Sequence, residues 1–225
     1  MTMQLIIGNC NYSTWSMRPW LYAHYHQLPI DIVGMNLFSD ELLAKLEGHF
    51  SNGKVPLLLD GDIEVWDSIA ILEYFGEKFP QTDPWPATAA ARAAARSVSA
   101  EMHSSFTALR NEAPMNCRKR FPGYKLSAQA RGDVDRIQSL WRYCRQNFGR
   151  QGPWLFGRFS IADAMYAPVV MRFRSIDVEL GDIARSYCQT VNDCPSVKQW
   201  ISNGLGESYI VTEDELDFPG EQLTC

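Results

Sequence analysis

The stretch "CNYST" (residues 10–14) places one thiol and three hydroxyl groups directly before a run that is predicted to be helical. Read as C-x-x-S, the stretch suggests thiol redox chemistry at Cys10. The alternative is that a hydroxyl of Ser13, Thr14 or Tyr12 acts on a thiol that belongs to a bound molecule. Such a hydroxyl would donate a hydrogen bond to the thiolate, and the start of the helix would add its positive dipole end.

A second stretch, "KVPLLLDGD" (residues 54–62), opens a predicted strand with a proline. Proline has no N–H to contribute to a sheet and is unusual at such a position. A cis bond between Val55 and Pro56 would turn the backbone of Val55 outward, where it would pair with an extended ligand. An ordinary strand start is the alternative interpretation.

A third pair, Asp67-Ser68, stands at the predicted start of a helix, where Asp67 is a suitable N-cap. The free N–H groups of such a helix start also suit a carboxylate, and Asp67 could receive an ammonium group. The head of an amino acid carries both charges and would fit there. By contrast, Ser160-x-x-Asp163 resembles a capping box, which predicts a role in folding.

The elements that must position these residues are expected to be alternating strands and helices in the first 80 residues and helices in the rest of the chain. Val, Ile and Leu runs, turn residues and helical spacing predict the order β-α-β-α-β-β-α. The expected strands cover 4–9, 31–37, 56–60 and 63–66, and the expected helices cover 15–25, 41–50 and 68–79. After a proline-rich linker (81–86) we expect a long helix over 87–111, further helices over 127–148, 160–174, 182–192 and 195–203, and an irregular acidic tail.

Composition narrows the class of protein. The 225 residues are 46% hydrophobic and 21% charged, which is typical of a folded chain. A net charge of −5 argues against a nucleic-acid partner. No apolar run is long enough to span a membrane, no secretory signal is seen, and the six cysteines lack metal-site or disulfide spacing. We therefore expect a cytoplasmic protein with no metal.

Taken together, the element order, "KVPLLLDGD", "WDSIAILEYF", the linker and "SIADA" resemble the cytosolic glutathione transferases over essentially the whole chain. The resemblance is to bacterial members of the serine type, with zeta- and theta-like features. It implies a thioredoxin-like domain over 1–80, an all-helical domain over 87–225 and a homodimer. It also implies glutathione as the co-substrate.

The resemblance also implies a role for several residues. Val55 resembles the backbone clamp for the cysteinyl part of glutathione, and Pro56 the cis-proline of the family. Asp67 and Ser68 resemble the γ-glutamyl site, and Lys54 is a candidate for the glycyl carboxylate.

The catalytic hydroxyl of serine-type members lies shortly before an arginine in the first turn of the first helix. Aligned on Arg18, this position falls on Ser13, with Thr14 as the second candidate. Cys10 comes too early to match the cysteine of the omega class. Ser16 is expected to be a helix cap.

In the family, the electrophile site combines the loop after the first strand with the long helix after the linker. Candidate residues for this site are Trp15, Met102, His103, Phe106 and Arg110. The resemblance implies conjugation of glutathione to small hydrophobic electrophiles, a detoxification reaction.

Three other functions stay open. The zeta-like loop suggests an isomerase of the maleylacetoacetate type, in which Arg172 or Arg174 would meet an acidic substrate, although both arginines are displaced from the family position. A non-enzymatic binding module and glutathione-dependent thiol reduction through Cys10 are the remaining two.

Overall fold

The computed structural model describes residues 2–223, so Cys225 lies outside the described residues. Its first half has the predicted order: β1 (Met3–Ile7), α1 (Thr14–Tyr25), β2 (Ile30–Gly34), α2 (Asp40–Leu46), β3 (Leu57–Asp60), β4 (Ile63–Trp66) and α3 (Ser68–Lys78). The four strands form one mixed sheet in the order β2-β1-β3-β4, in which β1 is parallel to β2 and antiparallel to β3. This half is a thioredoxin-like α/β domain.

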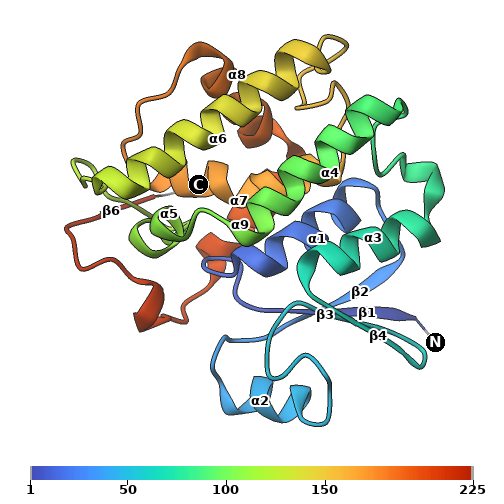
Figure 1. Ribbon diagram of the computed structural model, residues 1–225. Helices are drawn as coiled ribbons and strands as arrows, with labels where there is room; N and C mark the ends of the chain where they lie inside the picture. The colour runs from blue at the N-terminus through green and yellow to red at the C-terminus, as the bar shows by residue number, and fades with distance from the viewer. Residues whose placement is uncertain (1, 224–225) are drawn as a thin grey trace.

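Alternation along the strands explains how the sheet is covered on two faces. Leu5 and Leu58 belong to the large core that includes residues of α1 and α3, whereas their neighbours Ile6 and Leu57 pack with Leu42 and Leu46 of α2. Figure 1 shows α1 and α3 on one side of the sheet and α2 on the other. The β3–β4 hairpin turns at Gly61, whose φ of +63° explains the glycine.

The second half is helical: α4 (Ala89–Ser104), α5 (Thr107–Glu112), α6 (Ala128–Asn147), α7 (Ile161–Ser175), α8 (Asp182–Asp193) and α9 (Pro195–Gly206). The single long helix expected over 87–111 is wrong, because the chain breaks at Phe106, which has a φ of +65°. The expectation of a wholly irregular tail is also wrong. Residues Glu221–Gln222 (β6) pair with Lys119–Arg120 (β5), a pairing too short to leave a periodic pattern.

Helix α7 lies at the centre of the helical half and is buried along almost all of its length. Its start is closed as predicted, because the Asp163 carboxylate accepts the N–H of Ser160 at 3.0 Å. The same carboxylate accepts the N–H of Leu155 and the hydroxyls of Ser160 and Tyr187. Burial raises the pKa of Asp163 to about 6, against the lowering effect of these bonds.

The two halves share one core, because α1 packs against both α7 and α9. The predicted linker (81–86) lies between α3 and α4 and contains the end of a short 3-10 helix, Pro80–Thr82. A domain boundary there stays a prediction. Within residues 2–223, every helix is too short or too polar to cross a membrane.

Candidate functional site

A pocket of about 750 Å³ opens where the thioredoxin-like half meets α5, α7 and the C-terminal segment. Its lining includes every residue predicted for catalysis or glutathione binding: Ser13, Thr14, Lys54, Val55, Pro56, Asp67 and Ser68. These residues come from three separate motifs, at the starts of α1, β3 and α3. The fold therefore brings the three motifs to one cavity.

The start of α1 differs from three other helix starts that carry a serine or threonine at the N-cap. Ser39, Thr88 and Ser127 accept an N–H of the helix that each of them begins. Ser13 occupies the same N-cap position, but its hydroxyl makes no capping bond. It donates instead to the Ser16 hydroxyl at 2.8 Å.

Ser16 was expected to be a helix cap, and this expectation is wrong. It lies inside α1, fully buried, and its hydroxyl accepts the N–H of Gly8 at 3.1 Å. Ser16 thus joins the end of β1 to the first turn of α1. Ser13 lines the pocket, and its hydroxyl is not used to cap the helix.

The other candidates in the 10–14 stretch differ in what surrounds them. Cys10 is absent from the lining of this pocket, and burial together with the nearby Glu207 carboxylate raises its thiol pKa far above the usual value. Tyr12 does line the pocket, but its hydroxyl donates to Glu215 at 2.5 Å. Burial and that bond raise the pKa of Tyr12. Neither group is a ready thiolate or phenolate.

The peptide bond between Val55 and Pro56 is cis. Neither the N–H nor the C=O of Val55 has a hydrogen-bond partner among residues 2–223. Val55 is half-buried at the pocket wall. An extended peptide could therefore pair with it through two backbone hydrogen bonds.

Asp67 starts α3 in a strained conformation. Its φ is +76°, which is rare for a residue other than glycine and typical of functional sites. Its carboxylate caps the N–H of Ile69 at 3.0 Å and lies 3.2 Å from Nε2 of His103. Burial and the cations Arg18 and Arg110 lower the pKa of His103, so the imidazole is neutral at pH 7 and leaves the Asp67 charge available.

Ser68 accepts a hydrogen bond from a buried arginine. Nη1 of Arg18 donates to the Ser68 hydroxyl at 3.1 Å, although Arg18 is fully buried. Its Nε and Nη2 meet no acceptor among the described residues. Burial and the neighbouring arginines lower the pKa of Arg18 well below its usual value.

The structure brings only part of the predicted electrophile set to the pocket. Trp15 and Arg110 line it, and the Arg110 guanidinium lies 5.0 Å from the centre of the Trp15 ring. Met102 and Phe106 are instead packed in the core, at 2% and 5% exposure. His103 lies behind the lining, edge-on to Trp15 at 5.3 Å.

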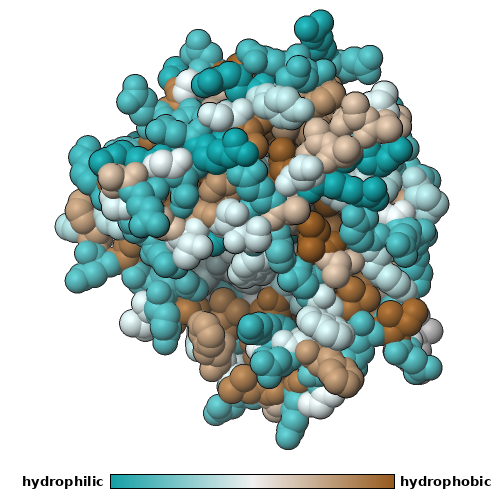
Figure 2. All heavy atoms as spheres, viewed as in Figure 1, coloured by the Kyte–Doolittle hydropathy of each residue, from teal (hydrophilic) through white to brown (hydrophobic). Residues whose placement is uncertain are grey.

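Other lining residues were not singled out from the sequence. Several apolar ones lie on and around α2, where Figure 2 shows hydrophobic side chains gathered on the lower part of the surface; they include Leu37, Phe38, Leu43, Phe50 and Trp66. Asp214 reaches the pocket from the C-terminal segment. No local pattern marks Asp214, because only the folding of the distant tail brings it there.

Of the two arginines considered for an acidic substrate, only Arg172 reaches the pocket. It donates to the carbonyls of Arg110 and Ala113, and burial together with Arg110 lowers its pKa to about 9. It is therefore still a cation at pH 7. Arg174 instead donates to the Cys117 carbonyl at 3.3 Å.

Comparison with known proteins places both halves in one family. Residues 12–78 match the model of the glutathione S-transferase N-terminal domain, and residues 89–202 match that of the C-terminal domain. A zeta-class glutathione S-transferase of Euphorbia esula is 29% identical over 145 residues, which are 63% of this chain. The match spans 59% of that curated relative's length.

Solved structures support the same fold. A glutathione transferase homologue from Burkholderia with bound glutathione is 21% identical, with a TM-score of 0.66 over 90% of this chain and 97% of its own. Glutathione transferase Omega 3C from Trametes versicolor is 16% identical, with a TM-score of 0.68 over 89% of each chain. The chain therefore belongs to the glutathione S-transferase family.

Proposed function

We propose that this protein is a glutathione transferase that adds the thiolate of glutathione to small electrophiles. One observation carries the proposal: Ser13 stands at the N-cap of α1, lines the pocket and leaves its helix uncapped. A hydroxyl in that position is free to turn from Ser16 toward a bound sulfur. Thr14, the next residue of the lining, is the second candidate for this role.

The remaining motifs suit the parts of the tripeptide. The unpaired backbone of Val55 would hold the cysteinyl residue, and the start of α3 with Ser68 would hold the γ-glutamyl carboxylate. Asp67 would receive the ammonium group, and Lys54 the glycyl carboxylate. This arrangement would place the sulfur near the start of α1.

The energy required is within reach of these groups. A free thiol has a pKa of about 8.5, and lowering it by two units needs about 2.7 kcal/mol. A hydrogen bond from a hydroxyl to a charged sulfur contributes about 1.5–3 kcal/mol. The helix start adds about 0.3–1 kcal/mol. No general base is required.

The reaction then needs only the bound thiolate. Its sulfur forms a bond to the electrophilic carbon, and a leaving group such as halide departs with the electron pair of the broken bond. Once the sulfur has lost its negative charge, the hydrogen bond from the Ser13 hydroxyl to the sulfur becomes weaker, which favours product release.

The test measures the thiol pKa of bound glutathione in the wild type, Ser13→Ala and Thr14→Val. The pKa is obtained from the thiolate absorbance as a function of pH. We expect Ser13→Ala to raise this pKa by one to two units and to lower kcat/KM for an aryl halide by about ten- to a hundred-fold, at about 1.4 kcal/mol per factor of ten. Glutathione affinity in calorimetry should change less than about three-fold, because Ser13 contacts only the sulfur.

An unchanged thiol pKa in Ser13→Ala would contradict the assignment to Ser13. If Thr14→Val alone raises it, the hydroxyl belongs to Thr14. Glutathione binding without turnover of any electrophile would support the non-enzymatic alternative.

A second candidate function is favoured by Arg172. A buried cation in the pocket suits an acidic substrate, as in glutathione-dependent cis-trans isomerisation of the maleylacetoacetate type. A cis-diketo acid tests this candidate: its isomerisation should fall in Arg172→Met, while aryl-halide conjugation falls less. Arg174→Met, outside the pocket, is the matched control.

We further propose a cytoplasmic homodimer. The five cysteines of the described part are buried free thiols, which fits a reducing compartment. Phe50, 79% exposed and stacked on the half-exposed Trp66, offers apolar surface to a second copy. A monomeric mass in light scattering at micromolar concentration would contradict the dimer.

A further inference from the structure

The loop between β1 and α1 is held by a carboxylate from the far end of the chain. Glu207 directly follows α9, and its Oε1 accepts the N–H of Cys10 at 2.6 Å. Its Oε2 accepts the N–H of Asn11 at 3.0 Å. Two successive N–H groups that point to one anion form a backbone nest, and here the anion is a side chain of the protein itself.

These two bonds complete the hydrogen bonding of the loop. The Asn9 carbonyl accepts the N–H of Tyr12 at 3.2 Å and the N–H of Ser13 at 2.8 Å. With Glu207 in place, the four N–H groups of residues 10–13 all have an acceptor. Without its carboxylate, two buried N–H groups would lose theirs.

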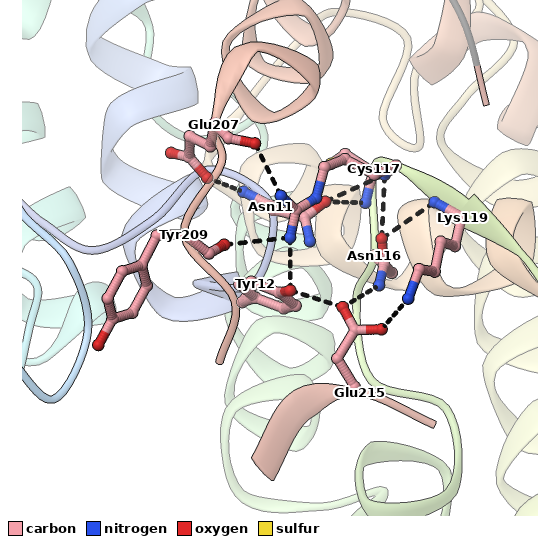
Figure 3. Close-up of polar contacts among 9 residues, drawn as sticks. Asn11, Tyr12, Asn116, Cys117, Lys119, Glu207, Tyr209 and Glu215 are labelled. Atoms are coloured by element: carbon pink, nitrogen blue, oxygen red, sulfur yellow. Dashed lines mark hydrogen bonds and ion pairs between the residues drawn. The ribbon is translucent and has the colours of Figure 1, made fainter. Parts of the chain in front are cut away.

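The side chains of the loop are held by a second carboxylate and by the segment around Cys117. Oδ1 of Asn11 accepts the N–H of Cys117 at 2.8 Å. Glu215 accepts the Tyr12 hydroxyl and pairs with Lys119, each at 2.5 Å. Figure 3 shows Asn11 between Glu207 and Cys117, with Glu215 beside the Tyr12 hydroxyl.

Arg118 and Gly204 tie the C-terminal segment to the same place. The Arg118 guanidinium donates to the Glu207 carbonyl at 2.7 Å and to the Tyr12 hydroxyl at 2.5 Å. A Cβ at Gly204 would lie 3.1 Å from the backbone nitrogen of Asn11, so α9 approaches the loop as closely as a glycine allows. The contacts come from residues far apart in the sequence and converge on one short loop.

We propose that Glu207 is a positioning residue for the transferase reaction, which holds the 10–13 loop so that the Ser13 hydroxyl faces the sulfur of bound glutathione. The inference rests on the proposed function. Glu207 acts directly on this loop, because Asn11 is only two residues before Ser13. Its carboxylate is the acceptor for two of the N–H groups of the loop. The same C-terminal segment carries Asp214 into the pocket lining.

The experiment compares the full-length wild type, Glu207→Ala and Glu207→Gln with Glu213→Gln as the matched control. Glu213 is an exposed acid of the same segment for which the structure shows no contact to the loop. Three readouts are taken: amide hydrogen exchange at Cys10 and Asn11, the thiol pKa of bound glutathione, and kcat with KM. Thermal unfolding shows that each variant is folded.

For Glu207→Ala we expect faster exchange at both amides, a higher thiol pKa and at least about a ten-fold loss of kcat, since a small misplacement of a catalytic group is costly. KM for glutathione should change less than about two-fold, because the Val55 and Asp67 sites are untouched. Glu207→Gln, which keeps one acceptor oxygen, should recover part of the loss. Glu213→Gln should match the wild type in every readout.

Faster amide exchange with an unchanged kcat and thiol pKa would overturn the positioning role. A lower thiol pKa in Glu207→Gln would also overturn it, because it would mean that the negative charge of Glu207 destabilises the thiolate in the wild type. If Glu207→Ala does not fold, Glu207→Gln carries the same three readouts. Ser13→Ala is measured beside them: if it leaves the thiol pKa unchanged, the proposed function fails, whereas amide exchange still reports on the loop.

Discussion

Helices α1 and α7 both begin at a buried serine, but the two starts are built in opposite ways. At α7, Ser160 and Asp163 satisfy each other, and Asp163 also takes donors from Leu155 and Tyr187. At α1, the Ser13 hydroxyl makes no capping bond, and Ser13 lines a pocket. The N–H groups of Trp15 and Ser16 in the first turn meet no acceptor among residues 2–223.

The difference separates folding from function. A helix start whose capping side chains bond to each other inside the protein contributes to stability and offers little to a ligand. A start that leaves donors free beside a cavity gives up that stability and can bind an anion. We therefore expect substitutions at α7 to change the free energy of unfolding, and substitutions at α1 to change activity.

The largest effect is expected from Asp163→Ala. The change leaves the N–H groups of Leu155 and Ser160 buried without an acceptor, and each such group costs about 1–3 kcal/mol. Urea unfolding should show a loss of about 3–5 kcal/mol, with glutathione affinity of the folded fraction unchanged. A loss below about 1 kcal/mol would mean that the α7 start is not the structural counterpart of α1.

The pH dependence of stability should single out the same carboxylate. Burial raises the pKa of Asp163 to about 6 in the folded protein, above its value in the unfolded chain. The folded state therefore holds this proton more tightly, and the stability linked to it is lost as pH rises through about 6. Between pH 4 and 7 the wild type should lose about 2.5 kcal/mol relative to Asp163→Asn, because a shift of one pKa unit is worth about 1.36 kcal/mol.

This difference is measured by urea unfolding of both proteins at several pH values, so that the other titrating groups cancel. A constant gap between the two proteins would contradict a raised pKa at Asp163.

Asp67, at the start of α3, combines both roles and sharpens the comparison. Asp67→Gly relieves the positive φ but loses the cap, two effects of about 1 kcal/mol each that oppose one another. The free energy of unfolding should therefore change little. The dissociation constant for glutathione should rise about ten-fold in calorimetry, because the partner of the ammonium group is lost.

Asp67→Asn is the control, since asparagine keeps the cap but not the charge. Both variants should bind glutathione with the same weakened affinity. Wild-type affinity in either one would remove Asp67 from the binding site.

The smallest effect is expected from the two serines themselves. Ser160→Ala removes one hydrogen bond to Asp163 and should cost about 1 kcal/mol in urea unfolding. Ser13→Ala removes no cap but loses the hydrogen bond to the Ser16 hydroxyl, so it should cost a similar amount. The two variants should differ in activity: Ser13→Ala should lower kcat/KM, whereas Ser160→Ala should leave kcat/KM of the folded protein unchanged. Equal kcat/KM in the two variants would remove the contrast between the helix starts.

Much of the fold could be predicted, because its signals are local. Strand alternation, the Asp60-Gly61-Asp62 turn and the caps at Ser39 and Asp67 are each readable within a few residues. The seven pocket residues predicted for catalysis or glutathione binding were found for the same reason. Each lies at or next to the start of an element that has its own motif.

The other side of the pocket could not be predicted in this way. The run over 87–111 begins with strong helix formers, and the weaker stretch around Phe106 is too short to end a helix by propensity alone, so the break there was not expected. Helical spacing placed Met102 on one stripe with pocket candidates, but such a stripe does not reveal whether it faces a cavity or the core. The choice of Arg172 over Arg174 likewise depends on how α7 is rotated in its surroundings.

The sequence by itself therefore determined the order of the elements, the three motifs and the residue types at each helix start. Only the tertiary structure decided that Glu207 and Glu215 hold the loop before Ser13, and that Asp214 and Arg172 face the same cavity. The physical reason is the distance along the chain over which each effect acts. Propensity, capping and turn geometry act within a few residues, whereas contacts between the two ends of a chain exist only after packing has brought them together.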